Sequence, residues 1–138
     1  MPSARRQARI LAMQALCQSD VQGDARDADL ESWFIEQDAP EAATAYAGTL
    51  VRAVASRRRE VDASLSSAAT RWDLARIGPV ERNIMRIAVV EMTGVDVPPK
   101  VAINEAVDIA REYGGADSPR FVNGILDQVM KVMRGDTI

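Results

Sequence analysis

The segment from Val80 to Val129 constrains the fold more strongly than any other part of this chain. Its apolar residues recur every three or four positions in three successive runs, which is the spacing of one buried helix face. Two short connections separate the runs, with Pro98-Pro99 in the first and Gly114-Gly115 in the second. Proline cannot continue a helix, and glycine commonly ends one. The segment therefore predicts three helices joined by two tight connections.

Helical spacing also runs through the first half of the chain, where we find no strand pair, hairpin signal or internal repeat. Helices are expected at residues 4–18, at residues 30–37 and from residue 41 to 68 with a break near Arg57. The polar stretch from Gln18 to Asp29 is expected to be a loop. The sequence thus predicts an all-α protein of about seven helices, arranged in two packed groups of about three.

A linker with Trp72, Leu74 and Ile77 divides the two groups. These three apolar side chains are expected to pack as a hydrophobic hinge. The N-terminal subdomain then covers about residues 1–70, and the C-terminal subdomain covers about residues 78–134.

Three helix starts carry capping signals. Ser3 is expected to cap the first helix, residues 38–41 form a capping box, and Ser118 is expected to cap the last helix. Asn104 and Asn123 are expected to be buried amides. In the helix that follows Pro98-Pro99, these residues are expected to face the core: Val101, Ala102, Ala106, Val107, Ala110 and Tyr113.

The composition excludes most catalytic and metal-binding sites. The chain has no histidine and one cysteine, Cys17. Zinc sites and Ser-His or Cys-His nucleophile pairs need those residue types, and no nucleotide-binding glycine motif is present. We therefore expect no enzymatic activity, no metal and no cofactor. No apolar run approaches the ~20 residues of a membrane span, and a single cysteine fits a reducing environment. A cytoplasmic protein with no membrane partner is expected.

The charge is unevenly distributed along the chain. Residues 1–19 carry Arg5, Arg6 and Arg9 and no acid, whereas residues 20–41 are strongly acidic. On a helix the three arginines lie largely on one side, because residues three and four apart are neighbours. The formal net charge is −3, yet attraction to phosphate acts locally, within about 8 Å. The N-terminus can therefore bind nucleic acid, and a solvated basic terminus is the alternative.

Four short runs carry a resemblance to a known family. They are ARRQAR at residues 4–9, VER at 80–82, KVAINEAV at 100–107 and DSPRFVNGILD at 117–127. The last two are the specific ones. Together they resemble the NusB family of bacterial transcription antitermination factors, and the resemblance extends over essentially the whole chain. It implies an all-helical, NusB-like fold of two three-helix bundles.

The resemblance also implies a function. Members of the NusB family bind boxA-type single-stranded RNA of nascent ribosomal transcripts, together with NusE, a ribosomal protein of the small subunit. The complex helps RNA polymerase to resist termination, so the elongation complex is an indirect partner. By this resemblance the chain is expected to be an RNA-binding antitermination factor.

The candidate RNA-binding residues lie near the start of the first helix and at the start of the last: Arg5, Arg6, Arg9, Gln14, Asp117, Arg120 and Phe121. Arginine offers forked donors for phosphate and a flat face for stacking. Phe121 lies one residue off the apolar stripe of its helix, which suits base stacking or, alternatively, a core position. Asp117 can accept hydrogen bonds from base amino groups, or it can cap the helix.

The helix expected at residues 79–93 is too apolar to be hidden against one neighbour. An inward stripe covers little more than a third of a helix circumference, whereas the apolar run here extends from Ile84 to Met92. Either the helix is central and buried nearly all round, or part of it faces a partner. By the family resemblance Glu81, Arg82 and Arg86 are expected at a rim that faces NusE.

The chain departs from the family pattern at three positions. Cys17 stands where an aromatic is usual, Gln7 where an arginine is common, and Pro119 where a histidine is frequent. Loss of an aromatic and of a positive charge weakens stacking and phosphate attraction.

Three alternatives stay open: a protein-interaction module with lost or weakened RNA binding, a stand-alone domain related to ribosomal RNA methyltransferases, and a homodimer that buries the arginine face.

Overall fold

The computed structural model describes residues 3–22, 27–70, 72 and 77–135, and all regular secondary structure in these ranges is helical. The helices are α1 (Ala4–Gln22), α2 (Asp27–Glu36), α3 (Glu41–Ser56), α4 (Arg58–Ala68), α5 (Pro79–Gly94), α6 (Pro99–Tyr113) and α7 (Ser118–Met133). The predicted all-α fold of about seven helices is thus confirmed.

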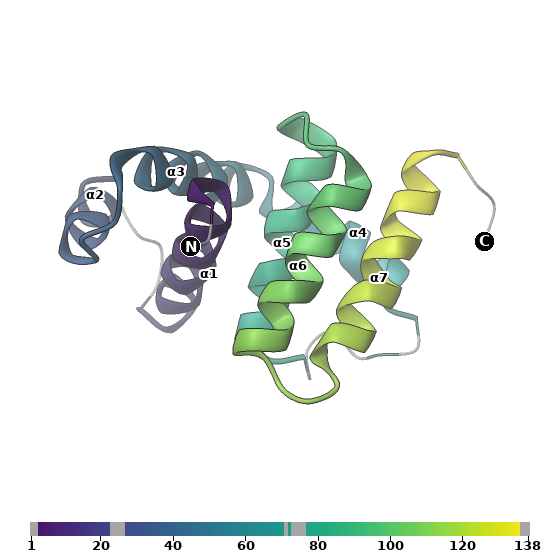
Figure 1. Cartoon of the computed structure of the whole chain (residues 1–138). Helices are drawn as coiled ribbons and strands as arrows, with labels where there is room; N and C mark the ends of the chain where they lie inside the picture. Colours follow the sequence, from purple (N-terminus) through teal and green to yellow (C-terminus); the bar gives the residue numbers. More distant parts are fainter. Residues whose placement is uncertain (1–2, 23–26, 71, 73–76, 136–138) are drawn as a thin grey trace.

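Two groups of helices lie side by side (Figure 1). One consists of α1, α2 and α3, and the other consists of α5, α6 and α7 with α4 packed against it. α5 joins the groups, because it contacts α1 and α3 of the first and α4, α6 and α7 of the second. The predicted boundary between subdomains, near residue 70, stays a prediction. Of the predicted hinge, Ile77 is buried and Leu74 lies outside the described residues.

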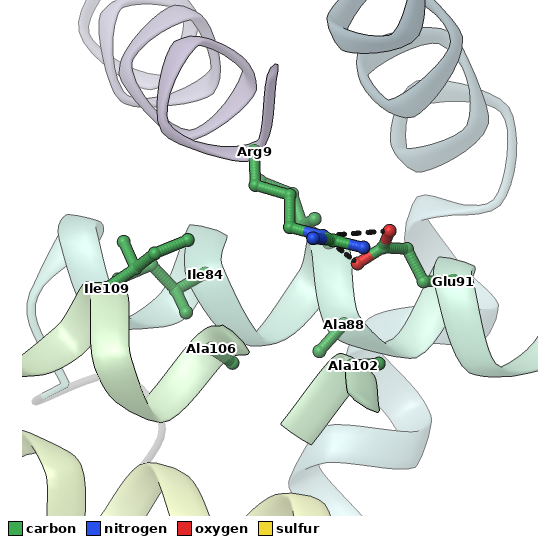
Figure 2. A pocket seen from close by; sticks show the side chains of 8 residues that line it. Arg9, Ile84, Ala88, Glu91, Ala102, Ala106 and Ile109 are labelled. Carbon is green, nitrogen blue, oxygen red and sulfur yellow. Dashed lines mark hydrogen bonds and ion pairs between the residues drawn. The ribbon is translucent and has the colours of Figure 1, made fainter. Parts of the chain in front are cut away.

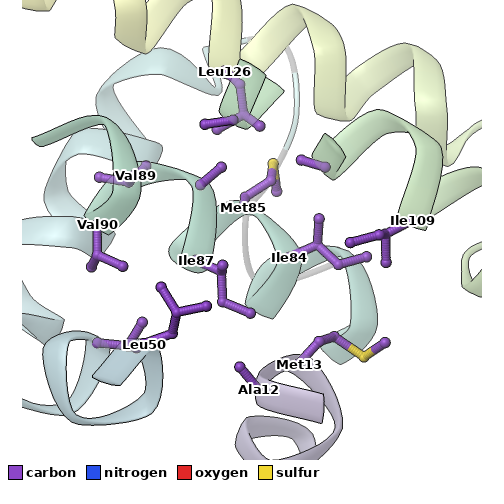
Figure 3. Close-up of a cluster of buried hydrophobic side chains, with 14 of the residues drawn as sticks. Ala12, Met13, Leu50, Ile84, Met85, Ile87, Val89, Val90, Ile109 and Leu126 are labelled. Atoms are coloured by element: carbon purple, nitrogen blue, oxygen red, sulfur yellow. The ribbon is translucent and has the colours of Figure 1, made fainter. Parts of the chain in front are cut away.

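α5 is buried nearly all round. Every residue from Asn83 to Met92 is buried, and apolar side chains of α1, α3 and α7 surround the helix, including Met13, Leu50 and Leu126 (Figure 3). Of the two alternatives that its sequence poses, α5 is therefore the central helix and not one with a long face open to a partner. Its first turn, Pro79 to Arg82, keeps at least partial exposure, so a partner can reach α5 only near its ends.

The start of α1 agrees with the sequence and its end does not. The hydroxyl of Ser3 accepts the Arg6 amide at 3.0 Å, as predicted for an N-cap. The predicted loop is wrong at its start, because the helix continues through residues 18–22. Asp20 lies in this extension and accepts a hydrogen bond from Asn83 of α5 at 2.9 Å. A tertiary contact thus stabilises a polar turn that by composition resembles a loop.

The starts of α3 and α7 lack the predicted caps. Pro40 stands at the N-cap of α3 without a side-chain hydrogen bond, and Asp38 adopts a left-handed backbone with φ 53°. Ser118 is the first residue of α7 rather than its cap. Its hydroxyl accepts the Gly115 amide at 2.8 Å and donates to Glu81 of α5 at 2.5 Å. A contact with another helix therefore replaces the local cap.

The buried face of α6 is rotated from the predicted one. Val101 and Tyr113 are 47% and 40% exposed, whereas Ile109 is buried. α6 packs against α5 and α7 together, and the position of these two neighbours, which the pattern of a single helix does not reveal, sets the buried face. Asn104 and Asn123 are exposed, so their predicted burial is wrong.

We expect Leu126→Ala to destabilise the protein strongly. Leu126 is fully buried and belongs to the same hydrophobic core as Met85 of α5 (Figure 3). Truncation leaves a cavity and should lower the free energy of unfolding by about 2–5 kcal/mol. Val132→Ala on the same helix, where the side chain is 53% exposed, is the matched control and should change it by less than about 0.5 kcal/mol. Urea denaturation followed by circular dichroism measures both, and equal effects would contradict this core.

Candidate functional site

The three arginines at the start of α1 lie in different environments. Arg5 is exposed, and its guanidinium carbon lies 3.9 Å from the centre of the Tyr46 ring of α3. Such a cation–π contact holds the side chain without neutralising its charge. Arg6 has 29% of its side chain exposed, and Arg9 is buried. The single basic face expected from the sequence is therefore divided between the surface and the interior.

Arg9 forms a buried ion pair that joins α1 to α5. Its Nε donates to both carboxylate oxygens of Glu91, at 2.9 and 3.0 Å (Figure 2). A terminal nitrogen donates to Glu105 of α6 at 2.8 Å. Burial alone would lower the pKa of Arg9, but the hydrogen bonds to Glu91 and the nearby carboxylate charges outweigh it and raise the pKa. The position of Arg9 is thus explained by the fold, and its role in RNA binding stays a prediction.

Arg6 is held by two carboxylates of α6. Its Nε lies 3.0 Å from a carboxylate oxygen of Glu105, and a terminal nitrogen lies 3.0 Å from one of Asp108. The hydrogen bond to Glu105 is the main cause that raises the pKa of Arg6. The side chain of Asp108 is 45% exposed. The pair between Arg6 and Asp108 is therefore open to solvent, unlike the buried pair of Arg9.

The start of α7 carries an aromatic pair in which Phe121 is half-buried and packs against the hydrophobic core. The ring centres of Phe121 and Trp72 lie 6.4 Å apart, with their planes inclined at 45°. Trp72 is 37% exposed, and a Cβ on Gly124 would lie 3.4 Å from the indole, so glycine leaves room for that ring. Arg120 is exposed on the same turn as Phe121. The sequence pattern assigns Trp72 to a hinge and misses this pairing, which only the fold brings about.

Two other candidates have less defined surroundings. Asp117 is exposed and precedes α7 without a side-chain capping bond, so the alternative of simple capping has no support. Gln14 is half-buried on α1. Within the described residues, no hydrogen bond or ion pair joins the arginines of α1 to the start of α7. The RNA-binding roles of Asp117 and Gln14 stay predictions.

The three candidate partner residues of α5 also differ in their contacts. Arg86 is buried and makes paired hydrogen bonds to Asp62 of α4, at 2.8 and 3.0 Å. Glu81 accepts the Ser118 hydroxyl and so holds the turn between α6 and α7. Arg82 is half-buried, and its Nε is buried with no acceptor in the part of the chain that the structure describes. Buried donors are usually paired, so the Arg82 Nε is an unsatisfied donor inside the fold.

The described residues contain neither a metal-binding cluster nor a membrane span. No group of three or more histidine, cysteine, aspartate or glutamate side chains could hold a metal, and no described helix is long and apolar enough to cross a bilayer. Burial raises the pKa of the Cys17 thiol, which disfavours the reactive thiolate.

A small cavity beside Arg9 and Glu91 is lined by apolar side chains such as Ile84 and Ile109 (Figure 2). Its only polar lining groups are already paired with each other, so it has the character of a packing gap.

Known proteins of one family are similar to this chain over nearly its whole length. The NusB family model matches residues 6–131. Transcription antitermination protein NusB of Anaeromyxobacter dehalogenans is 42% identical over 94% of this chain and 92% of its own length. A structure of T. maritima NusB is 32% identical, with a TM-score of 0.80 over 95% of this chain and 93% of that one. In a crystal structure of antitermination factors NusB and NusE in complex with dsRNA, one chain is 26% identical, with a TM-score of 0.83 over 96% and 99%.

We expect Tyr46 to ionise late and to link stability to pH. Burial and the hydrogen bond that its hydroxyl donates to Glu91 raise the pKa of Tyr46 to about 12, against an ordinary value of about 10. Because the folded-state pKa is raised, the stabilisation is present below about pH 10 and is lost as the pH rises toward about 12. Absorbance of tyrosinate should show the ionisation near pH 12 in the parent and in Tyr113→Phe. In Tyr46→Phe only Tyr113 remains, and although burial also raises its pKa, it lacks the hydrogen bond to Glu91 and should ionise earlier. A late transition that survives Tyr46→Phe would overturn the assignment.

Proposed function

The chain belongs to the NusB family, and we propose that it is a non-catalytic, RNA-binding transcription antitermination factor. The match over residues 6–131 is the observation that carries this proposal. Its relatives are named transcription antitermination protein NusB, and NusB and NusE have been crystallised together with dsRNA. In this function the protein binds boxA-type single-stranded RNA of nascent ribosomal transcripts together with NusE, in the cytoplasm, and acts on RNA polymerase indirectly.

The exposed groups at the starts of α1 and α7 support RNA binding. Arg5 and Arg120 are exposed cations, and Trp72 is an exposed aromatic ring paired with the half-buried Phe121. Single strands are held by positive charge along the backbone together with aromatic rings that stack on bases. The two groups of residues supply both elements, and Arg6 adds a partly exposed cation.

The buried arginines support the same function indirectly. Arg9 fixes the start of α1 on α5 and α6, so the positions of Arg5 and Arg6 are set by the core. Arg86 likewise fixes α5 on α4 through Asp62. Replacing either buried arginine is therefore expected to act on folding first.

The first turn of α5 supports a protein partner. Arg82 is a half-buried cation in this turn, and we propose that its guanidinium donates to an oxygen of NusE. Glu81 contributes by holding the adjacent turn through Ser118. A protein-interaction module with weakened RNA binding is the second candidate, since Gln7 and Cys17 replace residue types that favour RNA. Self-association through the arginine face is the third candidate, and the molar mass of the free protein in solution tests it.

We expect binding of a boxA-type single strand to weaken in Phe121→Ala and in Arg5→Ala. Loss of one stacking ring should cost about 1–3 kcal/mol of binding free energy. Affinity for the parent should also fall as salt rises, because bound phosphates release counterions. Fluorescence anisotropy with labelled RNA, with and without NusE, measures both effects. A duplex of the same sequence serves as the second ligand.

The matched control is Arg59→Ala, an exposed arginine on α4. It changes the net charge as Arg5→Ala does, but it lies outside the proposed RNA surface. The proposal fails if Arg59→Ala weakens binding as much as Arg5→Ala, or if binding does not respond to salt. Tighter binding of the duplex than of the single strand would contradict the preference for single strands.

We expect Arg82→Ala to weaken binding of NusE while leaving the free energy of unfolding nearly unchanged. A hydrogen bond to a charged group contributes about 1.5–3 kcal/mol, and here it forms only in the complex. Lys100→Ala, at an exposed position at the start of α6, is the control and should bind as the parent does. Glu81→Lys is a poorer test, because it also breaks the bond from Ser118. Calorimetric titration decides, and equal affinities of Arg82→Ala and the parent would refute the assignment.

A further inference from the structure

Two carboxylates of α6 form ion pairs with Arg6, a cation that the proposed RNA site needs. Arg6 lies between Glu105 and Asp108 of α6, with 3.0 Å from its Nε to Glu105 and 3.0 Å from a terminal nitrogen to Asp108. A carboxylate presents its oxygens to a guanidinium in the same forked geometry that a phosphate does. The α6 carboxylates therefore stand where an RNA phosphate would bind Arg6.

The two carboxylates differ in how firmly the fold holds them. Glu105 has 17% of its side chain exposed and also accepts a hydrogen bond from the buried Arg9. Asp108 is 45% exposed, and its other contact is to Arg111, 3.0 Å away on the surface of the same helix. An exposed ion pair contributes little to stability and is readily exchanged. Asp108 is thus the member of the pair that can release Arg6 without disturbing the core.

We infer that Glu105 and Asp108 compete with RNA phosphate for Arg6, so that these α6 carboxylates limit the affinity of the RNA site. The inference rests on the proposed RNA-binding function. RNA that reaches Arg6 must displace the Asp108 carboxylate, which then lies close to the phosphates of the RNA. The measured affinity is then the difference between phosphate binding and the loss of an internal pair. Removing the Asp108 charge raises the affinity without adding any contact to the RNA.

The test is a double-mutant cycle between Arg6 and Asp108. Asp108→Asn, Arg6→Ala and the double variant are titrated with labelled boxA-type single-stranded RNA at low salt, in the full chain with NusE present. Because the exposed pair is weak, Asp108→Asn is expected to bind RNA roughly twofold to fivefold more tightly than the parent. In the Arg6→Ala background the same substitution is expected to have no effect. In a plot of the logarithm of affinity against the logarithm of salt concentration, the slope should also be steeper for Asp108→Asn, by up to about 0.7 for one more phosphate contact.

Glu112→Gln is the matched control, because it removes one negative charge from an exposed position one turn further along α6. An equal gain in Glu112→Gln shows a general effect of net charge and overturns the inference. A gain from Asp108→Asn that persists in Arg6→Ala overturns it as well, since the freed Arg111 would then be the cause. The inference is also overturned if Asp108→Asn binds RNA no more tightly than the parent. If the parent binds no RNA under any condition, the proposed function itself fails, which is a result distinct from the others.

Discussion

The ion pair between Arg9 and Glu91 is the contact on which the junction of the two helical groups depends. Glu91 is 1% exposed, and its carboxylate accepts hydrogen bonds from Arg9 of α1 and Tyr46 of α3. Three helices therefore meet at one buried charge. Removing a partner from such a pair commonly costs about 3–5 kcal/mol, because the remaining charge stays buried and unpaired. Directional bonds thus act together with the apolar core in fixing the relative position of α1 and α5.

A second polar cluster fixes another side of α5. Arg86 pairs with Asp62 of α4, and its neighbour Asn83 donates to Asp20 of α1. These contacts explain how a helix that is buried nearly all round can contain amide and charged side chains: each is paired with a residue from another helix. The same pairing makes Arg86 unavailable to a partner protein. Contact with other molecules is left to the ends of α5, where Arg82 is only half-buried.

Apolar periodicity and the two short connections were enough to predict an all-helical fold, because those signals are local, but not the last turn of α1, which a contact from α5 stabilises. The partners of Arg9 lie 82 and 96 positions along the chain, so no local pattern distinguishes this buried arginine from the exposed Arg5. The pairing of Trp72 with Phe121 is likewise a contact between distant segments. The sequence therefore predicts which residue types serve the site, and the fold decides which of them remain at the surface.

Along the first turns of α1 the arginines pass from exposed to buried, and this order has a functional consequence. Arg5 lies over Tyr46, and Arg9 locks the next turn into the core. Immobilising a free arginine on binding costs about 0.5–1.5 kcal/mol. Much of that cost is already met here, because the helix and the Tyr46 ring hold Arg5 before any ligand arrives. Tyr46 thus contributes twice, through its ring to a surface cation and through its hydroxyl to the buried Glu91. The arrangement of the proposed site consequently depends on the same residues that join the two helical groups.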